Sequence, residues 1–256
     1  MTKDLENKVS KIKEFFNQLE FEESTHTYKV LGEQLSSASS TISNFYDSFD
    51  TDRVAGFVAK KRGITKEEVL KEWDDKRDFA CHKGHVVHAF GEDYMFDRTR
   101  EKDYPEFSGY MDAIINFWDS LPSHIVPAIA ELKMYSKQFN LAGTADIILY
   151  DKNRKGFIIA DYKTNIDLFK NFKGKKLKAP FNSLLECPMS KYKVQLSIYH
   201  YLFEQTGFKI LDRVIIWLKE DGSFEKYHTE DLTNKIKTYL TDEKQRSNSK
   251  NSAIIF

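Results

Sequence analysis

The sequence has few of the features that define several common protein classes. Only two of its 256 residues are cysteines, Cys81 and Cys187, and they form no CxxC pair, which excludes a zinc ribbon or a four-cysteine iron–sulfur site within one chain. No apolar run approaches the roughly 18 residues of a membrane span, and the N-terminal stretch has no signal-peptide core. We therefore expect a protein with reduced thiols in the cytoplasm, or in the cytoplasm of a phage-infected cell.

Net charge and phosphate-binding loops are also missing. The 39 basic and 39 acidic residues cancel, so any nucleic-acid site requires locally clustered lysines. Neither GxxxxGK[ST] nor GxGxxG occurs, and there is no internal repeat. These absences exclude the commonest nucleotide-hydrolase and dinucleotide-binding classes.

What is present is an apolar content of 41%, with 20 Phe and 13 Tyr, enough for a substantial core. Hydrophobic periodicity predicts alternating helices and strands. The expected helices are 3–19, 52–73 with a break near Gly63, 80–97, 107–121, 191–204 and 231–242, and the expected strands include 27–35 as a hairpin, 141–150, 157–163, 213–219 and 223–228.

The strands expected at Leu141–Tyr150 and Phe157–Lys163 flank a short polar run and predict a β-hairpin. In a symmetric hairpin Asp151 faces Gly156, and antiparallel pairing then sets Asp146 opposite Asp161. Like charges at a cross-strand distance of about 5 Å destabilise a sheet unless positive charge lies between them.

A divalent cation would supply that charge, and Lys163 projects from the same strand face as Asp161 because side chains alternate along a strand. Two acids that hold Mg²⁺ or Mn²⁺, with a lysine that stabilises negative charge, suit phosphodiester hydrolysis. Asp-x-Lys alone is also common as an ordinary exposed pair at a strand end.

Two further stretches carry alternative interpretations. In Ala80–Asp97, His88 lies one helical turn from Glu92 and near His85, which suits a metal ligand, although a lone helical histidine is more often structural. Asp167–Lys178 interleaves lysines with phenylalanines, which suits single-stranded nucleic acid as well as a mobile charged loop. Its candidate DNA-binding residues are Lys170, Phe172, Lys173, Lys175, Lys176 and Lys178.

Four short motifs follow one another along the chain. Their joint occurrence in this order is a more specific signal than any one motif alone. They are GxxxH at Gly84–His88, GxxD at Gly143–Asp146, DxK at Asp161–Lys163 and QxxxY at Gln195–Tyr199. In this order the chain resembles the RecB-type branch of the PD-(D/E)XK nuclease superfamily, which includes the mitochondrial genome maintenance exonuclease and phage exonucleases.

The resemblance implies a set of site residues. His88, Asp146, Asp161 and the carbonyl of Tyr162 would be metal ligands, and Lys163 would be catalytic.

Further roles come from the same resemblance. Gln195 and Tyr199 would position the DNA backbone or the metal-bound water, and Glu131 matches an acid that serves this branch as a second-tier metal or support residue. The chain departs from the branch in having His85 after Gly84, where Thr or Ser is common, and in lacking the four-cysteine cluster of the CRISPR-type members.

The expected fold is an α/β restriction-endonuclease-like core with a central mixed β-sheet flanked by helices. We expect an N-terminal helical and hairpin elaboration over residues 1–79, the nuclease core over 80–245 and a polar tail over 246–256. The expected function is Mg²⁺- or Mn²⁺-dependent DNA exonuclease action at single-stranded ends, with a possible replication or recombination protein as partner. A double-strand exonuclease, an endonuclease and a non-catalytic DNA-binding module are the alternatives.

Overall fold

A computed structural model describes residues 2–253 of the chain, with side chains to residue 246. Its centre is an eight-stranded mixed sheet ordered β1-β2-β3-β5-β6-β7-β8, with β4 paired to β5. The strands are β1 (Leu19–Glu22), β2 (Thr27–Val30), β3 (Glu33–Ser37), β4 (Ile125–Ser136), β5 (Leu141–Asp151), β6 (Gly156–Lys163), β7 (Ile210–Leu218) and β8 (Phe224–His228). The expected α/β class with a mixed sheet flanked by helices is confirmed.

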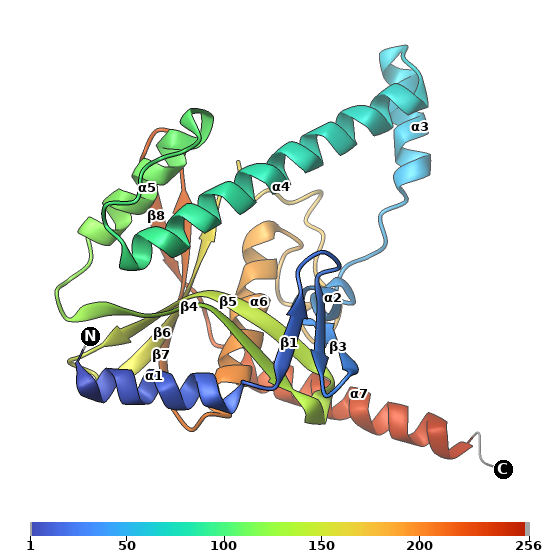
Figure 1. The fold of residues 1–256 in the computed structure, drawn as a ribbon. Helices are drawn as coiled ribbons and strands as arrows, with labels where there is room; N and C mark the ends of the chain where they lie inside the picture. Colours follow the sequence, from blue (N-terminus) through green and yellow to red (C-terminus); the bar gives the residue numbers. More distant parts are fainter. Residues whose placement is uncertain (1, 254–256) are drawn as a thin grey trace.

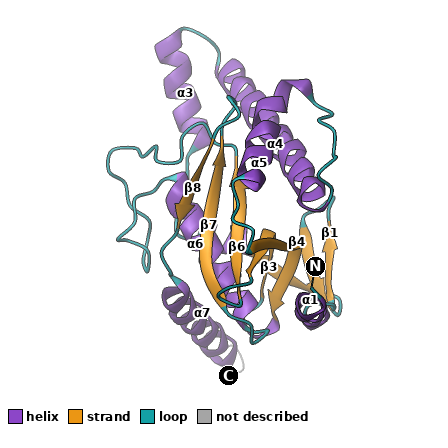
Figure 2. Ribbon diagram, turned by 90° about the vertical axis from the view of Figure 1, so that its left-hand side faces the viewer, coloured by secondary structure: helices purple, strands orange, loops and turns teal. Residues whose placement is uncertain are grey.

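The helices cover both faces of this sheet (Figure 2). They are α1 (Lys3–Phe15), α2 (Ala38–Ser43), α3 (Thr51–Arg62), α4 (Lys66–Phe96), α5 (Ser108–Asp119), α6 (Pro188–Glu204) and α7 (Thr233–Ala253), with short 3-10 turns at Pro105–Phe107 and Lys137–Phe139. Buried side chains of α1, α2, α6 and α7 form one apolar core, and those of α4 and α5 form another against strands β5 to β7. No helix in the described residues is both long and apolar enough to cross a membrane.

The predicted hairpin has the predicted register. Asp151 pairs with Gly156 and Ile148 with Ile159 across β5 and β6. The last pair of this ladder is Ile147 with Ala160, so Asp146 and Asp161 lie one step beyond it. Alternation along the two strands was enough to predict the register of the hairpin, and the two acids lie just past its last pair.

The edge of β5 that faces β6 has a gap. Strand β4 pairs with β5 along one edge, from Ile125 to Ser136. The other edge pairs with β6 at residues 147–151 and with β3 at Leu141 and Ala142. Residues 143–146 therefore lie where β3 and β6 separate, and no strand pairs with them on that side.

At this gap the side chains of β4 and β5 switch from one face of the sheet to the other. Ala145 packs in the core under α6, whereas Ile147 packs in the core under α4 and α5, although a regular strand would point both the same way. On β4 the change falls at Glu131, which has a positive φ of 48°. Backbone irregularities of this kind bend a strand and re-aim a side chain. Here they direct Glu131 and Asp146 out of the regular pleat.

Helix α4 is longer than expected. Thr65 and Glu68 form a capping box at its start, and the helix continues without a break to Phe96. The expected boundary between residues 79 and 80 therefore lies inside α4, whose first half projects from the body together with α3 (Figure 1). A small cluster that includes Ala55, Ala59 and Val69 joins these two helices.

Two chain segments differ from the expected elements. Leu19, expected at the end of the first helix, begins β1, because the helix stops at Phe15 and the chain turns into a hairpin. Residues 246–253, expected as a polar tail, continue α7, and the apolar end at 254–256 lies outside the described residues. Both cysteines are free, with Cys81 exposed and Cys187 buried.

Two glycines of α4 should respond oppositely to alanine. A Cβ at Gly91 would lie 2.5 Å from Cε2 of the buried Tyr162, whereas a Cβ at Gly84 meets nothing within 4 Å. We expect Gly91→Ala to lower the free energy of unfolding by about 1–3 kcal/mol through overpacking. We expect Gly84→Ala to raise it by up to about 1 kcal/mol through helix propensity. Urea unfolding of the two variants measures both, and equal destabilisation would contradict the packing described for α4.

Candidate metal centre

Three side chains from three different elements meet at the gap in β5. The ligand atoms of His88 on α4, Asp146 on β5 and Asp161 on β6 all lie within 4.8 Å of one another. His88 Nδ1 is 3.0 Å from Asp146 Oδ2. In the described residues this is the one cluster of at least three His, Cys, Asp or Glu side chains with that spacing.

Lys163 completes the cluster from the end of β6. Its ammonium donates to Asp161 Oδ1 at 2.6 Å and lies 4.5 Å from the centre of the Tyr192 ring on α6. The side chain of Asp161 is 2% exposed and that of Lys163 is 13% exposed, so the pair is shielded from water. A charge-assisted hydrogen bond in this setting is stronger than one at the surface.

The pKa values of the two carboxyl groups shift in opposite directions. Burial and the charge of Asp146 raise the pKa of Asp161, and Lys163 only partly opposes them. Burial alone would raise the pKa of Asp146 too, but His88 and Lys163 outweigh it and hold that pKa below its ordinary value. Close acids behave this way because only one of them ionises easily. A cation bound between the two carboxylates would take the place of the proton that Asp161 otherwise keeps.

The cationic groups respond to the same carboxylates. Burial disfavours the charged form of Lys163, but Asp161 and Asp146 raise its pKa to about 12. His88 behaves alike, because Asp146 overcomes the effect of burial and raises the pKa of the imidazole. Lys163 therefore carries its positive charge throughout the physiological pH range.

Helix α6 forms the opposite wall. Gln195 Nε2 donates to the hydroxyl of Tyr199 at 2.8 Å, as their spacing of one turn predicts. The ring of Tyr199 packs closely against Gly143 on β5. A Cβ at Gly143 would lie 2.7 Å from Tyr199 Cε1, so only glycine fits there. The glycine of GxxD thus has a packing reason, whereas that of GxxxH, Gly84, has none.

The donor set fits a hard divalent cation. Oδ2 of Asp161 and Oε1 of Gln195 are buried and accept no hydrogen bond from the protein. Buried acceptors in proteins are normally satisfied by a protein donor, an ordered water or an ion. Carboxylate oxygens with one imidazole suit Mg²⁺ or Mn²⁺ better than thiophilic metals. The cluster of His88, Asp146 and Asp161 could therefore hold a metal ion.

Comparisons with known proteins leave the family open. No protein-family model matches the chain, and no curated protein matches it. The resemblance to the PD-(D/E)XK nucleases rests on the four motifs and their order.

The structure distinguishes between the two candidate histidines. His88 faces the acids, whereas His85 is exposed and lies outside the cluster. The Tyr162 side chain lies on the α4 side of the sheet, where its hydroxyl accepts a hydrogen bond from Trp118 Nε1 at 2.8 Å. Any contact of Tyr162 with a metal would involve its carbonyl, as the resemblance implies.

The candidate DNA-binding lysines fall into two groups. Lys175 pairs with Asp47 and Glu186 at 3.2 and 3.1 Å, and Lys178 donates to the carbonyl of Tyr46 at 2.7 Å, so both fasten their loop to the body. Lys170, Lys173 and Lys176 are exposed, as are Phe172 and the paired Lys178. Buried Leu177 and Phe181 anchor the same loop in the core.

Three neighbours of the site had not been predicted. Tyr192 lies one turn before Gln195, so helical spacing could have revealed it. Tyr28 on β2 shares a 2.8 Å hydrogen bond with the Thr144 hydroxyl, and Lys83 on α4 donates to the carbonyl of Thr164 at 3.1 Å. These last two contacts join segments far apart in sequence, for which no local signal exists.

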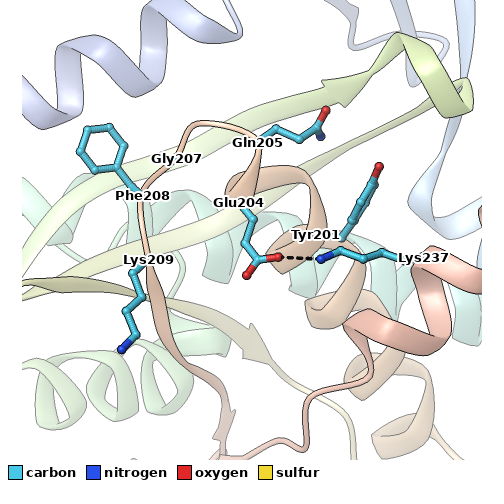
Figure 3. A pocket seen from close by; sticks show the side chains of 7 residues that line it. All are labelled: Tyr201, Glu204, Gln205, Gly207, Phe208, Lys209 and Lys237. Carbon is cyan, nitrogen blue, oxygen red and sulfur yellow. Dashed lines mark hydrogen bonds and ion pairs between the residues drawn. The ribbon is translucent and has the colours of Figure 1, made fainter.

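A surface pocket of about 490 Å³ lies away from the metal centre. It is formed at the end of α6, where Glu204 pairs with Lys237 at 3.2 Å (Figure 3). It shares no residue with the cluster of His88, Asp146 and Asp161.

Glu131 provides a test of the electrostatics. Burial and the charges of Asp146 and Glu92 raise its pKa from 4.5 to about 7. A carboxyl whose pKa is raised by folding favours the folded state below about pH 4.5 and loses that contribution as pH rises through 7. We expect metal-free Glu131→Gln to be more stable than wild type at pH 8, by on the order of 2 kcal/mol, and equal to it at pH 4.5.

Urea unfolding at the two pH values, in EDTA, measures this difference. Glu20→Gln, which removes one of the two exposed acids of β1, is the control for the substitution itself. An equal gain for Glu131→Gln at both pH values would rule out ionisation as its cause.

Proposed function

We propose that the protein is a metal-dependent deoxyribonuclease of the restriction-endonuclease-like fold that degrades DNA from single-stranded ends. The observation that carries this proposal is the meeting of His88, Asp146 and Asp161 within 4.8 Å, with Lys163 bonded to one of the acids. Motif order and the mixed sheet support the same assignment. The exposed lysines and Phe172 in the loop that follows β6 favour a single strand as substrate.

Each group has a distinct task in this proposal. His88, Asp146 and Asp161 would hold Mg²⁺ or Mn²⁺, which when bound polarises the phosphate and lowers the pKa of a coordinated water. The Lys163 ammonium is placed to stabilise negative charge on the phosphate oxygens. Oε1 of Gln195, which has no donor among the described residues, is free to accept a hydrogen bond from the attacking water and so orient it.

Loss of the charged pair should abolish cleavage. We expect Asp161→Asn and Lys163→Ala each to lower kcat by at least about 100-fold, because each removes a group that acts on the transition state. Cleavage of an end-labelled oligonucleotide with Mg²⁺ measures the effect, and Asp119→Asn, at an exposed site on α5, is the control. Undiminished Mg²⁺-dependent cleavage by Lys163→Ala would refute the mechanism.

Substrate topology separates exonuclease from endonuclease action. We expect a linear single strand to be degraded and a covalently closed single-stranded circle of the same sequence to remain intact, because the circle offers no end. Gel analysis with the same enzyme sample measures both. Equal cleavage of the circle would show an endonuclease.

Metal titration addresses the non-catalytic alternative. Calorimetry should detect Mn²⁺ binding to the wild-type protein and its loss in Asp146→Asn. DNA binding without metal binding or cleavage would instead favour a binding module.

A further inference from the structure

An unusually exposed apolar side chain follows β6, the strand that carries Asp161 and Lys163. Ile166 is 94% exposed, the highest value among the large apolar side chains exposed in the described part of the chain. Phe169 and Phe172, in the same loop, are 49% and 72% exposed. Single exposed apolar residues are common on proteins, but Ile166 combines almost complete exposure with a position three residues after Lys163.

The backbone on either side of Ile166 is firmly held. Asn165 accepts hydrogen bonds from the Tyr192 hydroxyl on its side chain and from Trp217 Nε1 on its carbonyl, at 2.8 and 2.7 Å. Leu168 is fully buried, and its carbonyl accepts from the backbone N–H of Met189 at 2.8 Å. Ile166 therefore stands on an anchored turn, and its exposure is a property of the fold.

Ile166 lies close to Lys163. Three residues span at most about 11 Å, so Ile166 lies within that distance of Lys163 along the backbone. Tyr192 also links the two, since its ring lies under the Lys163 ammonium while its hydroxyl binds Asn165. A strand whose phosphate reaches Lys163 would bring its neighbouring bases to Ile166.

We propose that Ile166 is a wedge that enters the base stack next to the scissile phosphate and separates the two flanking bases. This inference rests on the proposed nuclease function and adds a residue that sets its substrate preference. Apolar side chains inserted between bases unstack them, at a cost of a few kcal/mol per step. Isoleucine suits this role because its branched Cβ leaves it stiff at χ1. The exposed Phe172 offers a surface on which a displaced base can stack.

Homopolymers that differ in stacking test the wedge. Oligo(dA) stacks strongly and oligo(dT) weakly, so loss of the wedge should impair cleavage of oligo(dA) more. We expect the ratio of kcat/KM for oligo(dT) to that for oligo(dA) to rise about tenfold in Ile166→Ala and to stay near the wild-type value in Ile166→Val. Leu31→Ala, which removes another exposed aliphatic side chain in the turn between β2 and β3, should leave the ratio unchanged.

A fluorescence experiment gives a second readout that needs no cleavage. An oligonucleotide with one 2-aminopurine brightens when that base unstacks. At saturating wild-type protein in EDTA, with the probe base scanned along the strand, we expect one position to brighten, and Ile166→Ala to abolish that signal.

The outcomes separate the two proposals. Absence of metal-dependent cleavage by wild type refutes the nuclease function, and the fluorescence arm still decides the wedge. Cleavage with an unchanged dT to dA ratio in Ile166→Ala refutes the wedge and leaves the nuclease standing. A fluorescence signal that survives in Ile166→Ala, or a wild-type protein that gives no signal, also refutes the wedge.

Discussion

The buried pair of carboxylates, Asp146 and Asp161, is the constraint on which the rest of the site depends. Two ionised carboxylates this close repel each other, so either one of them keeps its proton or positive charge lies nearby. Lys163 supplies part of it through its contact with Asp161, and His88 supplies part beside Asp146. Among the described residues, Oδ2 of Asp161 accepts no hydrogen bond from a neighbouring donor. The cluster could therefore hold a metal ion.

The geometry of the sheet brings Asp146 and Asp161 together. Strands β3 and β6 share one edge of β5 but leave residues 143–146 without a strand partner between them. At the same place β4 and β5 lose their regular alternation, and Glu131 takes a positive φ that is uncommon for a residue other than glycine. Strain of this kind persists where the surrounding structure enforces it and is concentrated at functional sites.

Segments from the whole chain support the centre. Lys83 ties α4 to the end of β6, so it fixes the helix that carries His88 relative to the strand that carries Asp161. Tyr28, from the N-terminal hairpin, reaches Thr144 next to the gap. The N-terminal hairpin therefore contacts the central sheet next to the site.

The sequence by itself determined the local features: the hairpin register, the position of Lys163 beside Asp161, and the contact of Gln195 with Tyr199. These follow from the periods of strands and helices, which depend on neighbours in the chain. Only the tertiary structure decided that His88 faces the acids and His85 does not, that Lys175 and Lys178 are already paired, and that Tyr28 and Lys83 adjoin the centre. Such contacts join residues tens to more than a hundred positions apart, and their geometry is set by how helices and strands pack, which no local pattern encodes.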